Sequence, residues 1–381
     1  DVYKRQYLDK LDLTVTEFVP MDDLRATDSG RTVGPKAAKL GEMRQHYPEA
    51  VANGLAIPFG IFREIALEQP HPDGGTVFEW MQGMYRKLGP VDALDSAQAA
   101  RYDAVRRELY DLIANVSLLG EFEQPLRSAL RSVFGDRPVP GLFVRSDTNV
   151  EDLAGFTGAG LNLTLPNVVG VEALLEAIPR VWASPFTARA FAWRQSHMSE
   201  PEHVYTSILL LESVASDKSG VLVTQDIDTG GKGTISVAVN EGLGGAVDGQ
   251  AAESLRIDRS TGKVRVLATA TAPTRRIPDP DGGLEYLKAS GSDTVLTTDE
   301  IRQLIDFTNS LPQRFPPIVD DRGNPAPADV EFGFLKGELQ LFQLRPFLES
   351  RNARGSQYLV TMDQALGDTT GIRVDMNGRP R

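Results

Sequence analysis

Apolar side chains recur three or four residues apart over much of the first 140 residues, which is the repeat of one face of a helix. The clearest example is the set Tyr102, Val105, Leu109, Leu112 and Val116. This spacing predicts helices over residues 35–46, 78–88, 97–117 and 121–134. The stretch 55–62 is apolar but contains Pro58 and Gly60, so we expect it to be extended. Residues 7–140 are therefore expected to form a mostly helical lobe.

The pattern changes after a Pro- and Gly-rich boundary at residues 138–141. Short apolar runs predict strands near 141–145, 204–214, 220–225, 234–240 and 263–268, and a β-hairpin over 328–334 and 338–344. Helical spacing returns at 170–183, 186–195 and 301–314. We therefore expect an α/β (α+β) chain with a second lobe over residues 141–349.

The two ends of the chain differ in character from the rest. Residues 1–6 (DVYKRQ) are interpreted as non-native sequence or the start of a fragment, and we expect the natural protein to continue upstream. Residues 350–381 are polar and rich in glycine, so we expect a loosely held tail.

Composition narrows the class of protein. Hydrophobic residues make up 41% and charged residues 24%, as in globular proteins. The net charge of −12 argues against nucleic acid or an anionic membrane as a partner. The absence of cysteine excludes disulfides, thiolate metal sites and a Cys nucleophile. With apolar stretches far shorter than the ~20 residues that span a bilayer, we expect a soluble, cytoplasmic protein.

The predicted hairpin carries the most specific chemistry. Asp329 and Glu331 alternate with apolar residues and so share one face of their strand, and Gln343 and Arg345 share a face of the next. A three-residue loop, 336–338, would pair Glu331 with Gln343 and Asp329 with Arg345, whereas a two-residue loop would place the two pairs on opposite faces. Such a face could hold Mg²⁺ by its oxygens and a phosphate by the arginine fork. An exposed hairpin face with an ordinary ion pair is the alternative.

Two further positions could bind phosphate. Lys36 lies at a predicted helix start, where backbone N–H groups and the helix dipole attract anions. Arg145 ends a predicted strand and is followed by a loop with glycines at 155, 158 and 160, whose amides could approach phosphates. A solvated lysine and a plain surface loop are the alternatives. Neither a GxxxxGK[ST] nor a GxGxxG sequence is present, which excludes the P-loop and Rossmann motifs.

The four histidines give no sign of a nucleophile or a zinc site. They are His46, His71, His197 and His203. They are scattered along the chain, and none lies in a Gly-, Thr- or Ser-rich context. We interpret each of them as structural or solvated.

Several motifs together resemble one family. The segments are GPKAAKLG at 34–41, IPFG at 57–60, VRSDTNVEDL at 144–153, FTG at 156–158, VWAS at 181–184, EGLG at 241–244, DVEF at 329–332 and LFQLRP at 341–346. In this order, over residues 33–347, they resemble the ATP-binding domain of phosphoenolpyruvate synthase, pyruvate phosphate dikinase and the glucan water dikinases.

The resemblance implies a two-lobed, ATP-grasp-like fold that binds ATP and Mg²⁺. Its implied catalytic residues are Lys36, Arg145 and Arg345, which would contact the phosphates, and its metal ligands are Glu331 and Gln343. The implied nucleotide-binding set is Lys36, Arg145, Gly158, Glu212, Val214, Glu331, Gln343 and Arg345, with Glu212 and Val214 on the adenine side. In this family ATP phosphorylates a histidine on a swivelling domain, which passes the phosphate to pyruvate, glucan or another acceptor.

The chain also departs from the family pattern. Pro35 and Gly245 replace a family glycine and the glutamate of GLGE, and the family's nucleophile motif TSHxA is absent. We therefore expect a module of a larger phosphotransferase, with the histidine domain elsewhere in the full-length chain. Two other functions remain open: an ATP-grasp ligase that forms an acyl-phosphate, and a degenerate, regulatory nucleotide-binding module.

Overall fold

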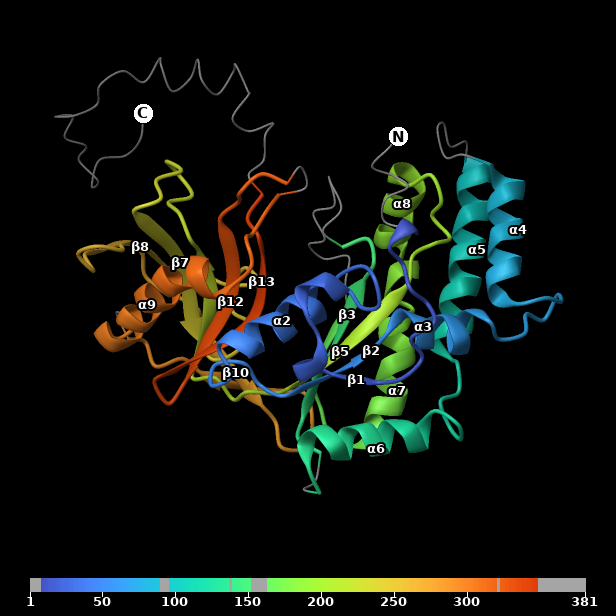
Figure 1. Cartoon of the computed structure of the whole chain (residues 1–381), viewed down its shortest axis with the longest axis horizontal. Helices are drawn as coiled ribbons and strands as arrows, with labels where there is room; N and C mark the ends of the chain where they lie inside the picture. Colours follow the sequence, from blue (N-terminus) through green and yellow to red (C-terminus); the bar gives the residue numbers. More distant parts are fainter. Residues whose placement is uncertain are drawn as a thin grey trace, which may run out of the picture. The chain divides into compact units, whose positions relative to one another are not determined.

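A computed structural model describes residues 8–89, 96–136, 139–151, 163–292, 294–320 and 323–348 (Figure 1). Residue contacts divide the chain at residue 346, and every helix and strand described below belongs to the unit Asp1–Pro346. The elements mix helices with antiparallel sheets, which confirms the predicted α+β class. The segments 1–6 and 350–381 lie outside the described residues, so the interpretation of both ends stays a prediction.

Within the described residues, the smaller of the two main sheets has the strand order β1-β2-β5-β3-β4 and is antiparallel throughout. Its strands are β1 (Val19–Pro20), β2 (Gly54–Ile57), β3 (Leu142–Thr148), β4 (Thr164–Val168) and β5 (Thr206–Glu212). Successive side chains of a strand point to opposite faces. Ile208 and Leu210 accordingly belong to one hydrophobic core, and Leu209 and Leu211 belong to another.

The core on one face of this sheet is built with helices. They are α4 (Val77–Leu88), α5 (Ser96–Ala114), α6 (Glu123–Phe134), α7 (Val171–Trp182) and α8 (Ala188–His197). Trp182 lies at the centre of this core, with its ring between those of Phe62 and Phe122. The predicted helices are thus confirmed, with ends that differ by a few residues.

The stretch 55–62, which we expect from its sequence to be extended, is extended only in its first half. It begins as strand β2, but α3 (Phe59–Phe62) follows and continues into a short π-helical turn over Arg63–Leu67. Pro58 lies at the change, with a φ of −64°, and a proline keeps the residue before it out of the helical region, so the helix begins only after Pro58. The prediction of a single extended segment was wrong for its second half.

The larger sheet has the order β13-β12-β6-β7-β8-β9 among the described residues. Its strands are β6 (Lys218–Val223), β7 (Thr234–Glu241), β8 (Glu253–Asp258), β9 (Val264–Ala268), β12 (Ala328–Leu335) and β13 (Glu338–Pro346). The second core joins its apolar side chains to those of α9 (Thr298–Arg314) and α2 (Pro35–His46). The helices α2 and α9 match their predictions, whereas β1, β4 and β8 were not predicted, because none of them contains an apolar run of strand length.

A separate hairpin pairs β10 (Thr274–Pro278) with β11 (Leu284–Lys288). Its strands are partly exposed and rich in charge, so no apolar run predicted them. The predicted lobe boundary at residue 140 stays a prediction about folding units, but it does not separate sheets. Strand β2, before it, pairs with β5, after it.

The hairpin β12–β13 corrects one prediction and confirms another. Its loop has two residues, Lys336 and Gly337, with φ of 53° and 82°, as in the two-residue turns that match strand twist. The predicted three-residue loop was therefore wrong. The register of the polar residues is nevertheless as predicted, with Glu331 opposite Gln343 and Asp329 opposite Arg345. A β-bulge beside Phe342 supplies the extra residue that the shorter loop removes.

Candidate functional site

A cleft of about 740 Å³ is lined by residues of both main sheets, the start of α2, and the hairpin β10–β11. Most of the residues predicted to bind the nucleotide line it, namely Lys36, Arg145, Glu212, Val214, Glu331, Gln343 and Arg345. Gly158 lies outside the described residues. The structure thus brings together residues that are up to 309 positions apart in the sequence. Their roles remain predictions.

The start of helix α2 is held by a residue that the sequence analysis missed. Asp147, at the end of β3, accepts hydrogen bonds from the backbone N–H groups of Lys36 (3.0 Å) and Ala37 (2.8 Å). These are the donors expected to attract a phosphate, and Asp147 occupies them instead. Burial raises the pKa of the Asp147 carboxyl to about 7, although the charge of Lys36 and these hydrogen bonds oppose the shift. The phosphate contact expected here is left to the Lys36 side chain.

The side chain of Lys36 is already bound within the protein. Its Nζ donates to the Ser146 carbonyl at 3.0 Å and forms an ion pair with Glu151. A phosphate that reached Lys36 would therefore compete with Glu151. Proline at position 35, where the family has glycine, does not destabilise α2. It is suited to the first position of a helix, because the N–H group that it lacks has no partner within the helix.

Gly34 is needed where α2 meets β3. A Cβ added there would lie 2.2 Å from Asp147 Oδ1 and 2.7 Å from the Asp147 backbone carbon. We expect Gly34→Ala to lower the free energy of unfolding by about 1–3 kcal/mol, as overpacked sites do. Gly83→Ala in α4 is the matched control, since nothing lies within 4 Å of its added Cβ. Urea unfolding measures both variants, and equal stability of Gly34→Ala and wild type would contradict the expectation.

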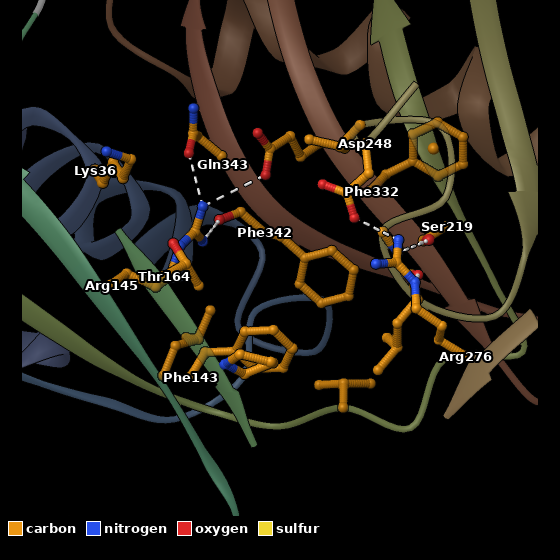
Figure 2. A pocket seen from close by; sticks show the side chains of 18 of the residues that line it. Lys36, Phe143, Arg145, Thr164, Ser219, Asp248, Arg276, Phe332, Phe342 and Gln343 are labelled. Atoms are coloured by element: carbon orange, nitrogen blue, oxygen red, sulfur yellow. Dashed lines mark hydrogen bonds and ion pairs between the residues drawn. The ribbon is translucent and has the colours of Figure 1, made fainter. Parts of the chain in front are cut away.

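Arg145 joins the two sheets across the cleft (Figure 2). From β3 its Nη1 donates to the Phe342 carbonyl at 2.8 Å, and its Nη2 donates to Gln343 Oε1 at 2.7 Å. Nη2 also lies 3.4 Å from Glu331 Oε2. The guanidinium therefore lies beside both predicted metal ligands, and its positive charge balances the carboxylate of Glu331.

The donor set of Glu331 and Gln343 suits Mg²⁺. The ion takes oxygen ligands, usually one or two from the protein and the rest from water and substrate phosphates. Glu331 Oε2 and Gln343 Oε1 lie 3.4 and 2.7 Å from Arg145 Nη2, so one carboxylate and one amide oxygen face the same part of the cleft. The described residues contain no group of three or more His, Asp or Glu side chains placed to hold a metal ion. Metal binding here would therefore depend on a ligand's phosphates.

Arg345 is oriented by a buried carboxylate. Its Nε donates to Asp329 Oδ2 at 2.8 Å. Burial raises the pKa of the Asp329 carboxyl, and the positive charge of Arg345 opposes that shift. The pairing raises the pKa of Arg345 in turn, against the effect of burial. Asp329 thus fixes the direction of the guanidinium fork at the cleft.

Apolar side chains line the space between the charged groups. They include Phe143, Leu211, Leu243, Leu284, Phe332 and Phe342. The bulge in β13 places Phe342 in the cleft next to Gln343, and Gly333 leaves room for its ring, 2.8 Å from where a Cβ would lie. An apolar space lined by aromatic side chains suits a nucleotide base. Alternation along β13 could not reveal Phe342, because a bulge breaks that alternation.

A second charged pair faces the cleft from the larger sheet's side. Arg276, on β10, lies 2.5 Å from Asp248 and donates through Nε to the Leu243 carbonyl at 3.0 Å (Figure 2). The sequence analysis missed both residues, and no motif marks them. Gly245, which stands where the family has glutamate, lies in the same loop as Asp248. A Cβ at Gly245 would lie 2.7 Å from Gln250 Oε1, so a glutamate at this position would displace the Gln250 side chain.

No helix among the residues that the structure describes is both long and apolar enough to cross a membrane.

The described residues form an α+β domain with a cleft between its two main sheets, and a comparison with protein families shows to which class it belongs. Residues 30–365 match the family described as "Pyruvate phosphate dikinase, AMP/ATP-binding domain", and the chain belongs to that family. The resemblance found in the sequence motifs is thereby confirmed.

Curated relatives include phosphotransferases and synthases. The chain is 28% identical to a rifampicin phosphotransferase of a Streptomyces species, over 85% of this chain and 35% of that protein. It is 28% identical to probable phosphoenolpyruvate synthases of Pyrococcus abyssi (74% of this chain, 34% of that protein) and Archaeoglobus fulgidus (84% and 40%). The chain thus spans little more than a third of the length of these relatives.

One solved structure, an L-amino acid ligase from Bacillus licheniformis, aligns with 75% of this chain and 57% of its own at 10% identity. Its TM-score of 0.23 is too low to bear on the fold.

Proposed function

We propose that this chain binds Mg·ATP in the cleft and donates phosphate from it, as one module of a dikinase-type phosphotransferase. One observation carries the proposal. Arg145 from the smaller sheet meets Glu331 and Gln343 of the larger sheet, in a cleft that Lys36 and Arg345 also line. Three cations beside two oxygen ligands suit a polyphosphate with its metal ion.

Each of these residues has a distinct task in the proposed reaction. Lys36, Arg145 and Arg345 would neutralise the phosphate oxygens, which is most of what a protein contributes to phosphoryl transfer. Asp329 would keep the fork of Arg345 aimed at them. Mg²⁺, when bound, would draw charge from the phosphate oxygens beside Glu331 and Gln343. Glu212 and Val214 would lie along the adenine.

The acceptor in this proposal is a histidine on a separate swivelling domain. The chain covers about a third of its phosphotransferase and synthase relatives, which leaves room for such a domain in a full-length protein. Pyruvate, a glucan or another acceptor would receive the phosphate from that histidine. Among the histidines with described side chains, none lines the cleft.

Replacing Glu331 by glutamine tests the metal-dependent part of the proposal. We expect wild-type protein to bind ATP more tightly with Mg²⁺ than without it, and Glu331→Gln to lose roughly tenfold or more of that gain, about 1.4 kcal/mol. The reason is that Mg²⁺ prefers a carboxylate oxygen to an amide oxygen. Isothermal titration with and without Mg²⁺ measures both affinities.

Glu338→Gln is the matched control, because Glu338 lies exposed at the turn of the same hairpin and outside the cleft. It should bind as wild type does. Equal affinity of the Glu331→Gln variant and wild type in Mg²⁺ would overturn the metal assignment, and absence of ATP binding by wild type would overturn the proposed function.

A further inference from the structure

The two main sheets share the second hydrophobic core and are bridged by Arg145, and the hairpin β10–β11 also contacts both of them. In the described part of the chain, β1 to β5 belong to the smaller sheet, and β6 to β9 with β12 and β13 belong to the larger. The strands therefore cross from one sheet to the other once, between Glu212 and Lys218. The rest of the connection between the sheets is made by packing and hydrogen bonds.

The hairpin β10–β11 is fastened to the larger sheet's side of the cleft. The Leu243 N–H donates to the Arg276 carbonyl at 2.9 Å, and Arg276 Nε donates to the Leu243 carbonyl. Just beyond β11, the Ser290 N–H and hydroxyl both donate to the carboxylate of Glu241, at the end of β7. These contacts, with the Asp248–Arg276 pair, fix one part of the hairpin to the larger sheet.

The tip of the same hairpin is fastened to the smaller sheet. Asn167, on β4, donates from Nδ2 to the carbonyls of Asp279 (2.7 Å) and Gly283 (2.8 Å). Its own carbonyl accepts from the Gly283 N–H at 2.9 Å. Asn167 is buried and has a φ of 47°, a left-handed conformation that few residues other than glycine and asparagine adopt readily. The local structure is thus arranged to present this amide to the hairpin.

Gly141 makes room for that arrangement. A Cβ at Gly141 would lie 1.9 Å from Asn167 Oδ1. Its carbonyl also accepts from the N–H of Ser213, the first residue after β5, so it lies beside the crossing between the sheets. The amide, the crossing and the hairpin tip therefore meet at one place.

From these contacts we propose that β10–β11 is a strap that joins the two sheets beside the nucleotide cleft, and that Asn167 is a positioning residue which sets the cleft's width through it. The strap borders the cleft directly, since Arg276 and Leu284 line it from the hairpin and Thr164 and Pro166 line it from β4. A cleft that is already held at one width loses less conformational entropy when its ligand binds, so it binds the ligand more tightly. The expected effect on nucleotide affinity rests on the proposed function, whereas the expected effect on the distance between the two sheets does not.

The distance between the sheets can be measured directly because the chain has no cysteine. Spin labels on Leu119→Cys, next to the core that covers the smaller sheet, and on Val266→Cys, on β9 of the larger sheet, report it by pulsed electron paramagnetic resonance without nucleotide; both positions are exposed. We expect a narrow distance distribution in the otherwise wild-type chain. Asn167→Gly, which keeps the left-handed backbone and removes the amide, should broaden or shift the distribution.

Two further variants make the test specific. Gly141→Ala should broaden the distribution as Asn167→Gly does, because it dislodges the same amide from a different residue. Asp281→Ala, an exposed change in the hairpin turn whose side chain does not contact Asn167, should leave the distribution unchanged. A distribution in Asn167→Gly as narrow as that of wild type, at the same mean, would overturn the strap.

Nucleotide affinity provides the second readout. We expect Asn167→Gly to raise the Kd for Mg·ATP about tenfold, and Asp281→Ala not to change it. A weaker affinity with an unchanged distance distribution would also overturn the strap, since Asn167 would then act locally. If wild type bound no ATP, the proposed function would fail while the distance measurement still decided the strap. Circular dichroism confirms that each variant is folded.

Discussion

Arg145→Ala is expected to lower the rate of phosphoryl transfer by about 10²-fold or more. The guanidinium lies beside both predicted metal ligands and links the two sheets, so its loss removes a cation and the geometry around it. Lys36→Ala and Arg345→Ala should each cost of order 10²-fold as well, because each removes one charge from the phosphate end of the cleft.

Arg145→Ala also leaves Gln343 Oε1 and the Phe342 carbonyl without their donor. An unsatisfied buried acceptor costs about 1–3 kcal/mol, so this variant should unfold at a lower temperature and yet be folded at 25 °C. Arg345→Lys should also transfer poorly, since a point charge does not replace the arginine fork.

Single-turnover transfer to an added histidine-bearing domain measures these rates, and circular dichroism checks the fold. Arg302→Ala is the matched control, because Arg302 is exposed on α9 and pairs only with Asp299 among the residues described. It should transfer at the wild-type rate. Wild-type rates in the three alanine variants of the cleft would contradict the proposed roles.

The isolated chain should form no phosphohistidine. A nucleophile must reach the phosphate in line, and the described histidine side chains are placed elsewhere. His46 pairs with Glu42, His71 is buried against the Trp80 ring, and His203 lies beside Tyr205. None of the three is among the residues that line the cleft.

Adding a histidine-bearing domain from the full-length protein should produce phosphohistidine on that domain, with AMP as the nucleotide product. The experiment incubates the chain, with and without that domain, with ATP labelled separately at the β- and γ-positions, and maps the phosphate by mass spectrometry. Stoichiometric phosphate on His46, His71, His197 or His203 would overturn the modular proposal. ADP formed only with an acid and an amine present would favour the ligase alternative instead.

The local pattern of apolar and polar residues was enough to predict most of the helices and several of the strands. The repeat of apolar residues predicted the helices α2, α4, α5, α6 and α9, because burial of one helical face leaves a trace in the sequence. Alternation along the two final strands predicted that Asp329 and Glu331 share one face of the first strand and that Gln343 and Arg345 share one face of the second. Motif order identified the family that the comparison confirmed. The helical repeat and the strand alternation each lie within a few residues of the positions that they predict, whereas the order of the motifs extends over most of the chain.

The length of the last hairpin's loop and the bulge in its second strand could not be predicted from the local sequence. The sequence indicated a glycine at the tip of the last hairpin but not the loop length, since Gly337 suits both a two-residue and a three-residue turn. The register came out as predicted only because a bulge beside Phe342 compensated for the shorter loop. A bulge depends on how a strand packs against its partner, and no residue type announces it.

Only the tertiary structure decided how the cleft is assembled. Arg145 reaches acceptors almost 200 residues away, Asp147 occupies the start of a helix more than 100 residues before it, and Asn167 holds a hairpin tip more than 100 residues after it. Such contacts follow from the folding of whole sheets against each other, and hydrophobic periodicity carries no record of them. The sequence by itself therefore determined the family and predicted which residues would carry the chemistry, whereas the packing of the two sheets decided which of those residues meet and which already contact a neighbour.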